Sequence, residues 1–235
     1  AIRDIFLKRI IRAKGLTGVQ KLIEGIIMPT PAAVLKAVET LSKGSGGETG
    51  LGDLAAVDIG GATTDVYSIC DGMPSKSGVI MKGLPEPFSK RTVEGDLGVR
   101  YSAAFLAEMV GIEKISEMSG LGLEEVKACL ERINSAPETL PHDDIRIGKL
   151  DMALAAMAVK EAVKRHSGTI ETVYTPMGAA YMQTGKDLGR IKKIIGTGGP
   201  IINSLNPGEI LRQAMYDRNE PAVLKPVDAE ILVDF

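Results

Sequence analysis

One segment constrains the fold more than any other part of the chain. It begins with the apolar run Leu54 to Val57, continues through Asp58, two glycines and two threonines, and ends in a second strand-forming run, Val66 to Ile69. Glycines let neighbouring backbone N–H groups point outward together, which forms an anion-binding concavity. A Walker A loop or a dinucleotide fingerprint would lead into a helix, whereas this turn leads into a strand. The segment therefore predicts a β-hairpin whose turn binds phosphate.

A second glycine loop follows later in the chain. Ile194–Pro200 reads Ile-Ile-Gly-Thr-Gly-Gly-Pro, a strand that runs into a pair of glycines. Together, Asp58–Asp65 and Ile194–Pro200 resemble the second phosphate motif and the adenosine motif of the superfamily that holds actin, sugar kinases and heat-shock chaperones. Each loop by itself is also compatible with an ordinary tight turn. Two loops of different design in this order are far more specific for the superfamily than either loop alone.

This resemblance implies a role for each residue of the two loops. Asp58 would be the catalytic carboxylate and would hold Mg²⁺ through the water shell of the ion, for which a single carboxylate is sufficient. The alternative for Asp58 is a strand-end aspartate that caps its own turn. Asp65 is expected to brace the hairpin. The residues expected to contact the nucleotide are Gly60 and Gly61 through N–H groups, Thr63 and Thr64 through hydroxyls, and Gly198 and Gly199 against the nucleoside.

The region between the loops narrows the family. Lys82–Arg100, which reads KGLPEPFSKRTVEGDLGVR, is similar to the glutamate mutase L (MutL/GlmL) family, and Met28–Leu35 and Lys164–Gly168 resemble it as well. The resemblance implies an actin-like ATPase that reactivates an adenosylcobalamin-dependent aminomutase by exchanging damaged cobalamin for intact cofactor. The cofactors implied for this chain are ATP or ADP and Mg²⁺, whereas the cobalamin belongs to the partner enzyme.

Two other function classes are compatible with the same hairpin. One is an enzyme proper, either an actin-like-fold kinase, which needs a substrate-side base, or a hydantoinase-like enzyme, which needs a metal-ligand cluster that we do not find in the sequence. The other is a non-catalytic nucleotide-binding scaffold. Met28–Ala33 corresponds to the stretch that carries a water-positioning Glu or Gln in chaperone and actin relatives, and it contains neither. We therefore expect slow ATP hydrolysis or none.

Composition argues against several kinds of partner. The 28 Lys and Arg residues against 30 Asp and Glu give a net charge of −2, so there is no electrostatic case for nucleic acid. Cys70 and Cys129 have no framework spacing, which indicates a reducing compartment. No apolar run reaches the roughly 18 residues of a membrane span, and we expect no signal peptide. These features predict a cytoplasmic protein that binds neither nucleic acid nor membrane.

The order of elements predicts the α/β class and, with the motifs, an actin-like (ASKHA, ribonuclease H-like) ATPase fold. Residues 1–84 would hold helices and the phosphate hairpin, 85–165 a helix-rich inserted subdomain, and 166–235 the adenosine loop. Because an actin-like fold has a phosphate hairpin in each of two lobes and we find one, we expect the second lobe of a longer protein, inactive by itself. Helices are expected over 2–14, 31–43, 100–110, 122–132 and 150–166, and strands near 54–69, 78–80 and 192–195.

Four polar residues have structural interpretations. His142 lies in a polar loop, and His166 lies in the last turn of a predicted helix, where a positive charge favours the helix dipole. Glu94 and Asp96 flank Gly95, and for them the sequence leaves a ligand-facing role, a hinge and helix capping open.

Overall fold

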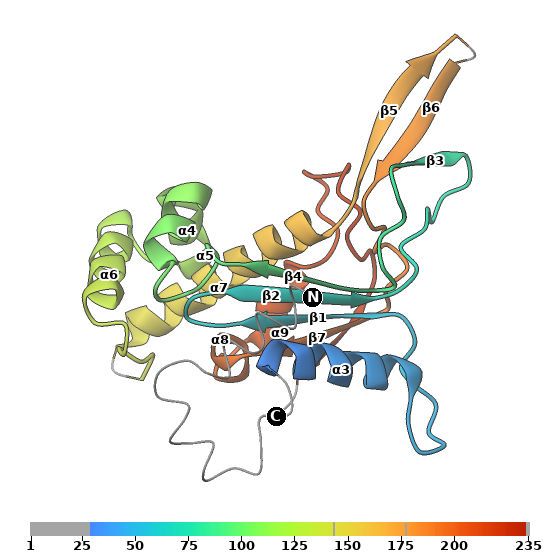
Figure 1. Cartoon of the computed structure of the whole chain (residues 1–235). Coiled ribbons are helices and arrows are strands. Elements are labelled where there is room, and N and C mark those ends of the chain that lie inside the picture. Colours follow the sequence, from blue (N-terminus) through green and yellow to red (C-terminus); the bar gives the residue numbers. More distant parts are fainter. Residues whose placement is uncertain (1–28, 143, 177, 234–235) are drawn as a thin grey trace.

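The computed structural model describes residues 29–142, 144–176 and 178–233, so the helix predicted over 2–14 lies outside the described residues. The described chain forms two sheets with helices around the larger one (Figure 1). In chain order the elements are α3 (Thr30–Lys43), β1 (Leu54–Ile59), β2 (Thr64–Ile69), β3 (Val79–Lys82), β4 (Ser89–Glu94), α4 (Ala103–Val110), α5 (Ile112–Ser119), α6 (Leu123–Ser135), α7 (Ile145–His166), β5 (Thr169–Thr175), β6 (Gly178–Thr184), β7 (Lys193–Thr197), α8 (Gly199–Ile202), α9 (Pro207–Arg212) and β8 (Glu230–Val233). The α/β class is confirmed.

The larger sheet has five strands in the order β4-β2-β1-β7-β8. The first three strands are antiparallel neighbours, and β1, β7 and β8 are parallel to one another. The predicted hairpin is present as β1 and β2, with Val57 opposite Val66 and Asp58 opposite Asp65. A three-stranded antiparallel unit is thus extended by two parallel strands, which are reached through helical connections.

Both faces of this sheet are covered, which explains why β1 is apolar on both sides. Val57 and Ile59 point toward the main core, which they share with α7 and α9, whereas Leu54 and Ala56 pack under α3 on the opposite face. The helix α3 has Pro31 in its first turn and is followed by Gly44 at its C-cap, as predicted. The alternation of side chains along β1 therefore places Asp58 on the α3 face.

The longest of the described helices, α7, crosses the sheet behind β2 and β1 (Figure 1). It starts earlier than predicted because the Asp144 side chain accepts a hydrogen bond from Arg146 N and caps the helix. Within the predicted helix-rich part 85–165, β4 belongs to the larger sheet and α7 packs over that sheet. The helices set apart from the sheet are therefore α4, α5 and α6, which pack on α7 and share its core. None of the helices in the described ranges is long and apolar enough to cross a membrane.

The smaller sheet, in the order β3-β6-β5, projects from the body of the molecule (Figure 1, upper right). The predicted strand near 78–80 is present as β3, which pairs in parallel with β6. The β5–β6 hairpin was not predicted from the sequence. Its residues are mostly exposed on both faces, in contrast to the buried strands of the larger sheet.

Candidate functional site

The two predicted loops lie beside each other at the carboxyl ends of β1 and β7 in the larger sheet. They meet because β1 and β7 are parallel neighbours, with Asp58 opposite Thr197. Gly198, at the end of β7, has φ +95°, and a Cβ atom there would lie 2.2 Å from Ile59 O and 2.7 Å from Asp58 Oδ1. This close approach requires glycine. At Gly199 a Cβ atom would meet nothing nearer than Asn203 Nδ2 at 3.9 Å.

The turn of the hairpin presents free backbone donors. Its carbonyls face the segment 95–102: Gly60 O accepts from Val99 N at 3.2 Å, and Gly61 O accepts from Arg100 N at 2.8 Å. The N–H groups of Gly61, Ala62 and Thr63 have no partner among the described residues. The N–H of Gly60, in contrast, donates to Thr63 O at 2.8 Å. This corrects the expectation that Gly60 presents its N–H to phosphate. The available donors are three successive N–H groups, which form an anion-binding concavity.

The two threonines of the turn differ in their environment. Thr64 is fully buried, and its hydroxyl donates to Leu97 O at 2.6 Å. A hydroxyl has one hydrogen to donate, so Thr64 has none left for a phosphate. The prediction for Thr64 is therefore wrong in this structure, and the residue fastens the turn. The Thr63 hydroxyl lies 3.5 Å from Asp65 Oδ2, a long contact that leaves it available to a ligand.

Asp58 is the acid at this end of β1, and it lacks a partner within the described ranges. Its half-buried carboxylate has no hydrogen bond or ion pair with any described residue, whereas Asp65 opposite it is bound by Arg91, with Nη2 2.6 Å and Nε 2.8 Å from Oδ1. Burial raises the pKa of the Asp58 carboxyl above its ordinary value, and the charge of Asp65 raises it further. Asp65 braces the hairpin, as predicted. A bound cation would lower the pKa of Asp58 again.

Sequence reasoning missed the residues that fasten the segment 95–102 under the turn. Arg100 binds Asp151 of α7 through two parallel bonds of 2.5 and 2.6 Å, and both side chains are largely buried. On the same helix, Arg165 binds Asp96 at 2.7 and 2.8 Å and Glu94 at 2.8 Å. These pairs give Glu94 and Asp96 a bracing role, which is none of the three alternatives that the sequence left open. Local sequence patterns cannot reveal such pairs, because the partners lie far apart in the chain.

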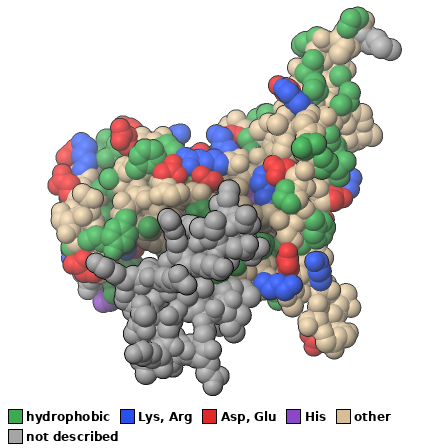
Figure 2. Space-filling model, in the orientation of Figure 1, with side chains coloured by type: hydrophobic (Ala, Val, Ile, Leu, Met, Phe, Trp, Pro, Cys, Tyr) green, Lys and Arg blue, Asp and Glu red, His purple; other side chains and the backbone are tan. Residues whose placement is uncertain are grey.

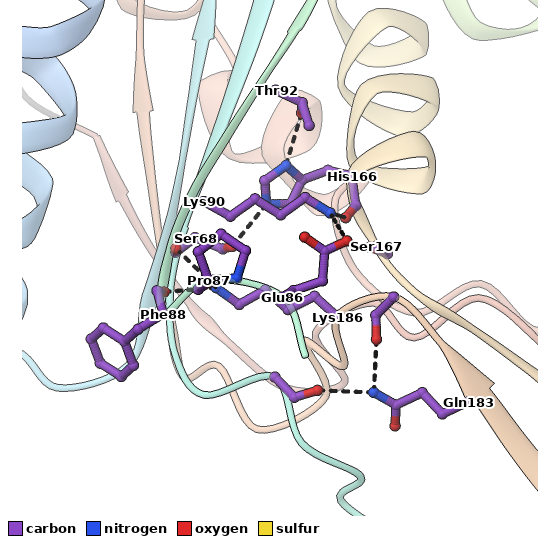
Figure 3. Close-up of polar contacts among 12 residues, drawn as sticks. Ser68, Glu86, Pro87, Phe88, Lys90, Thr92, His166, Ser167, Gln183 and Lys186 are labelled. Atoms are coloured by element: carbon purple, nitrogen blue, oxygen red, sulfur yellow. Dashed lines mark hydrogen bonds and ion pairs between the residues drawn. The ribbon is translucent and has the colours of Figure 1, made fainter. Parts of the chain in front are cut away.

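A second buried polar cluster lies at the C-terminal end of α7 (Figure 3). His166 is fully buried, with Nδ1 2.8 Å from Thr92 Oγ1 and Nε2 2.8 Å from Ser68 Oγ. Burial, together with the charges of Lys90 and Lys186, lowers the pKa of His166 to about 3. His166 is structural, as expected, but it is neutral at pH 7. The interpretation as a positive charge at the helix end is therefore wrong, because the ring lies in the interior.

Comparison with known proteins agrees with the motifs. A family model described as MutL protein matches residues 1–235. The chain belongs to the MutL family. It is 50% identical over 237 residues to a curated relative named Protein MutL from Clostridium tetanomorphum, and the match covers 99% of this chain. The same match covers 50% of the relative, so the chain spans about half the length of that MutL protein.

Proposed function

We propose that this MutL-family chain is the nucleotide-binding lobe of a longer ATP-dependent protein. The observation that carries the proposal is the hairpin turn, where the N–H groups of Gly61, Ala62 and Thr63 and the carboxylate of Asp58 all lack a partner among the described residues. Anions bind to such successive N–H groups, and a lone carboxylate beside them suits a cation that accompanies the anion. Gly199 leaves bare backbone for the nucleoside at the same end of the sheet, and Gly198 lets the loop approach β1 closely.

The residues present fit Mg²⁺. This ion keeps several waters and is usually held by one or two carboxylates together with substrate phosphates. Asp58 would hold it through water, and the ion would neutralise phosphate charge. The raised pKa of Asp58 supports this assignment, because no cationic side chain in the described part of the chain compensates the carboxylate. Asp65 would not take part, since Arg91 already binds it.

The sheet supports an actin-like lobe. Its antiparallel unit β4-β2-β1 is extended by the parallel strands β7 and β8, and helices cover both faces. In such a fold the nucleotide lies between two lobes, and the length of the MutL relative leaves room for another lobe. We place the phosphate hairpin and the adenosine loop in one lobe and α4–α6 in its inserted subdomain. The complete protein would be a slow ATPase.

The partner follows from the family resemblance. The complete protein would reactivate an adenosylcobalamin-dependent aminomutase of the glutamate mutase type by exchanging damaged cobalamin for intact cofactor. A change of lobe angle between the ATP and ADP states would open the partner. This requires that the two states bind the mutase with different affinities, since a ligand shifts an equilibrium only by its differential affinity.

Nucleotide binding is tested by calorimetry on the full-length protein that contains this chain. Wild type should bind Mg–ATP, and Asp58→Asn should lose the Mg²⁺ dependence of binding and the hydrolysis of ATP while remaining folded. The matched control is Asp228→Asn, which neutralises an exposed carboxylate elsewhere. If wild type shows no nucleotide binding at millimolar ATP, the proposal is wrong.

Reactivation is tested separately with an inactivated aminomutase of the same organism. The assay contains the full-length protein, free adenosylcobalamin and Mg–ATP. We expect mutase activity to recover with ATP, and to recover far less without ATP or with the Asp58→Asn variant. Equal recovery with and without ATP would reject the mechanism while leaving nucleotide binding intact.

A further inference from the structure

Three successive carbonyls of the hairpin turn accept hydrogen bonds from the segment 98–102. The bonds run from Val99 N to Gly60 O at 3.2 Å, from Arg100 N and Tyr101 N to Gly61 O at 2.8 and 2.9 Å, and from Ser102 Oγ to Ala62 O at 2.9 Å. Gly98 allows this close approach, because a Cβ atom there would lie 2.3 Å from Ala62 C and 2.5 Å from Gly61 O. The segment 98–102 therefore lies directly against the turn.

These bonds set the direction of the three free N–H groups. In a planar trans peptide unit, the C=O of one residue and the N–H of the next residue point in opposite directions. The carbonyls bound by 98–102 share their peptide units with the N–H groups of Gly61, Ala62 and Thr63. Because each carbonyl is held on one side, each N–H is turned to the other side, where one anion can accept from all three.

Arg100 anchors the segment 98–102 to the body of the protein. Its guanidinium forms two parallel bonds of 2.5 and 2.6 Å with Asp151 of α7, and it also donates to Val99 O at 2.9 Å and to Thr139 O at 3.2 Å. A bidentate pair fixes direction as well as distance, because the guanidinium is a planar, rigid fork. Arg100 thus connects the turn to α7 and to the loop that follows α6.

The Ser102 hydroxyl is a second tie to the turn. Ser102 is the N-cap residue of α4, but its side chain makes no capping hydrogen bond with that helix. A serine in this position usually accepts from an N–H group of the first helical turn. Here its hydrogen is shared between Ala62 O and Gly95 O, at 2.9 and 3.1 Å. The hydroxyl therefore serves the turn rather than the helix.

The arginines that contact the hairpin in the described part of the chain are both paired with aspartates. Asp151 binds Arg100, and Asp65 binds Arg91. Figure 2 shows acidic and basic side chains side by side on the face that it draws. An anion at the turn therefore depends chiefly on the direction of the N–H groups, which the segment 98–102 sets.

We propose that Arg100 and Ser102 are positioning residues, which keep the hairpin turn in its phosphate-binding form through the segment 98–102. This inference rests on the proposed function, because it explains how the same turn is kept ready for the nucleotide. Donors that are fixed before binding need no reorganisation when the ligand arrives. A merely structural role would lower the stability of the protein and leave the phosphate affinity of the folded form unchanged.

The test is calorimetry on the full-length protein with Mg–ATP and with adenosine, which has no phosphate. The first variant is Arg100→Met, Asp151→Leu, because an apolar pair keeps a buried site stable but cannot bind the carbonyls that Arg100 holds. We expect Mg–ATP to bind at least about tenfold more weakly and adenosine to bind as in wild type. The matched control replaces another ion pair of α7, Lys160 with Asp217 at 2.6 Å, by Lys160→Met and Asp217→Asn. It should bind both ligands like wild type.

Ser102→Ala tests the second tie in a protein that keeps the Arg100 pair. It should bind Mg–ATP about three- to tenfold more weakly, which is the contribution of one hydrogen bond. Ser102→Thr keeps the hydroxyl and should bind like wild type. Urea denaturation shows whether each variant is folded. If the double variant does not fold, Arg100→Lys replaces it, because lysine keeps the charge but lacks the fork.

Wild-type Mg–ATP affinity in a folded variant would overturn the positioning role of the residue that it changes, while the proposed function stands. Equal losses of Mg–ATP and adenosine affinity would also overturn this role, because the whole site would then have changed. If wild type binds no Mg–ATP, the proposed function fails and the positioning role fails with it.

Discussion

The neighbouring glycines of the adenosine loop allow folding and nucleotide binding to be tested separately. Gly198 has φ +95° and ψ 152°, and an added Cβ would lie 2.2 Å from Ile59 O and 2.8 Å from Ile59 N. Both of these are backbone atoms of β1, so a flexible side chain cannot move aside. Gly199 begins α8, and its added Cβ would meet nothing nearer than 3.9 Å.

The expected magnitudes follow from this geometry. For Gly198→Ala, the sparsely populated backbone conformation contributes about 1–3 kcal/mol of destabilisation. Overpacking against β1 contributes about 1–3 kcal/mol more. The free energy of unfolding should therefore fall by about 2–6 kcal/mol, at roughly 2–4 °C of melting temperature per kcal/mol. Gly199→Ala should be neutral or should stabilise by about 0.4–1 kcal/mol, because alanine restricts the unfolded chain.

Urea denaturation of this chain gives the stabilities, and calorimetry on the full-length protein gives the ATP affinity. We expect Gly199→Ala to remain as stable as wild type and to bind ATP at least tenfold more weakly, about 1.4 kcal/mol, because the methyl group meets the nucleoside. If Gly198→Ala is as stable as wild type, the close approach to β1 is wrong. If Gly199→Ala is stable and binds ATP normally, the loop is not the adenosine site.

Two further predictions concern buried polar groups of α7. Asp151→Asn should lower the free energy of unfolding by about 3–5 kcal/mol, because it leaves the Arg100 charge buried without its partner. Urea denaturation measures this change, and recovered stability in an Arg100→Met, Asp151→Leu double variant would support the reasoning. An Asp151→Asn variant as stable as wild type would contradict it. The folded pKa of about 3 at His166 lies below the ordinary 6.5, so the unfolded chain binds the proton first and stability is lost as pH falls from 6.5 toward 3. His166→Gln removes this group, so the slope of the free energy of unfolding against pH should fall in that window by up to about 1.4 kcal/mol per pH unit, the value for one proton. An unchanged slope would contradict a neutral buried ring.

The sequence by itself determined the elements whose signals are local. The hairpin β1–β2 follows from two apolar runs around a glycine pair, α3 from Pro31 and Gly44, and most of α7 from its alanine-rich pattern. The family could also be recognised from the sequence, because its motifs are short contiguous segments. These features depend on neighbours within a few residues, so they can be read without the fold.

Sequence patterns did not predict the strands whose residues are mixed or mostly polar. The strand β4 reads Ser-Lys-Arg-Thr-Val-Glu, which has no apolar alternation, and it is a strand because its charged side chains find partners on both faces of the sheet. Arg91 binds Asp65 on one face, and Lys90 donates to His166 O on the other. Propensity does not include such long-range partners, and tertiary contacts override it.

Only the tertiary structure decided which polar groups of the loops are available. Thr64 and Leu97 are 33 residues apart in the chain, and their hydrogen bond removes the Thr64 hydroxyl from the site. His166 and Ser68 are 98 residues apart, and their contact keeps the histidine buried and neutral. Residue types and spacing show which groups could bind a ligand. Whether a donor is free or already used depends on segments that folding brings together, because each buried polar group must find a partner.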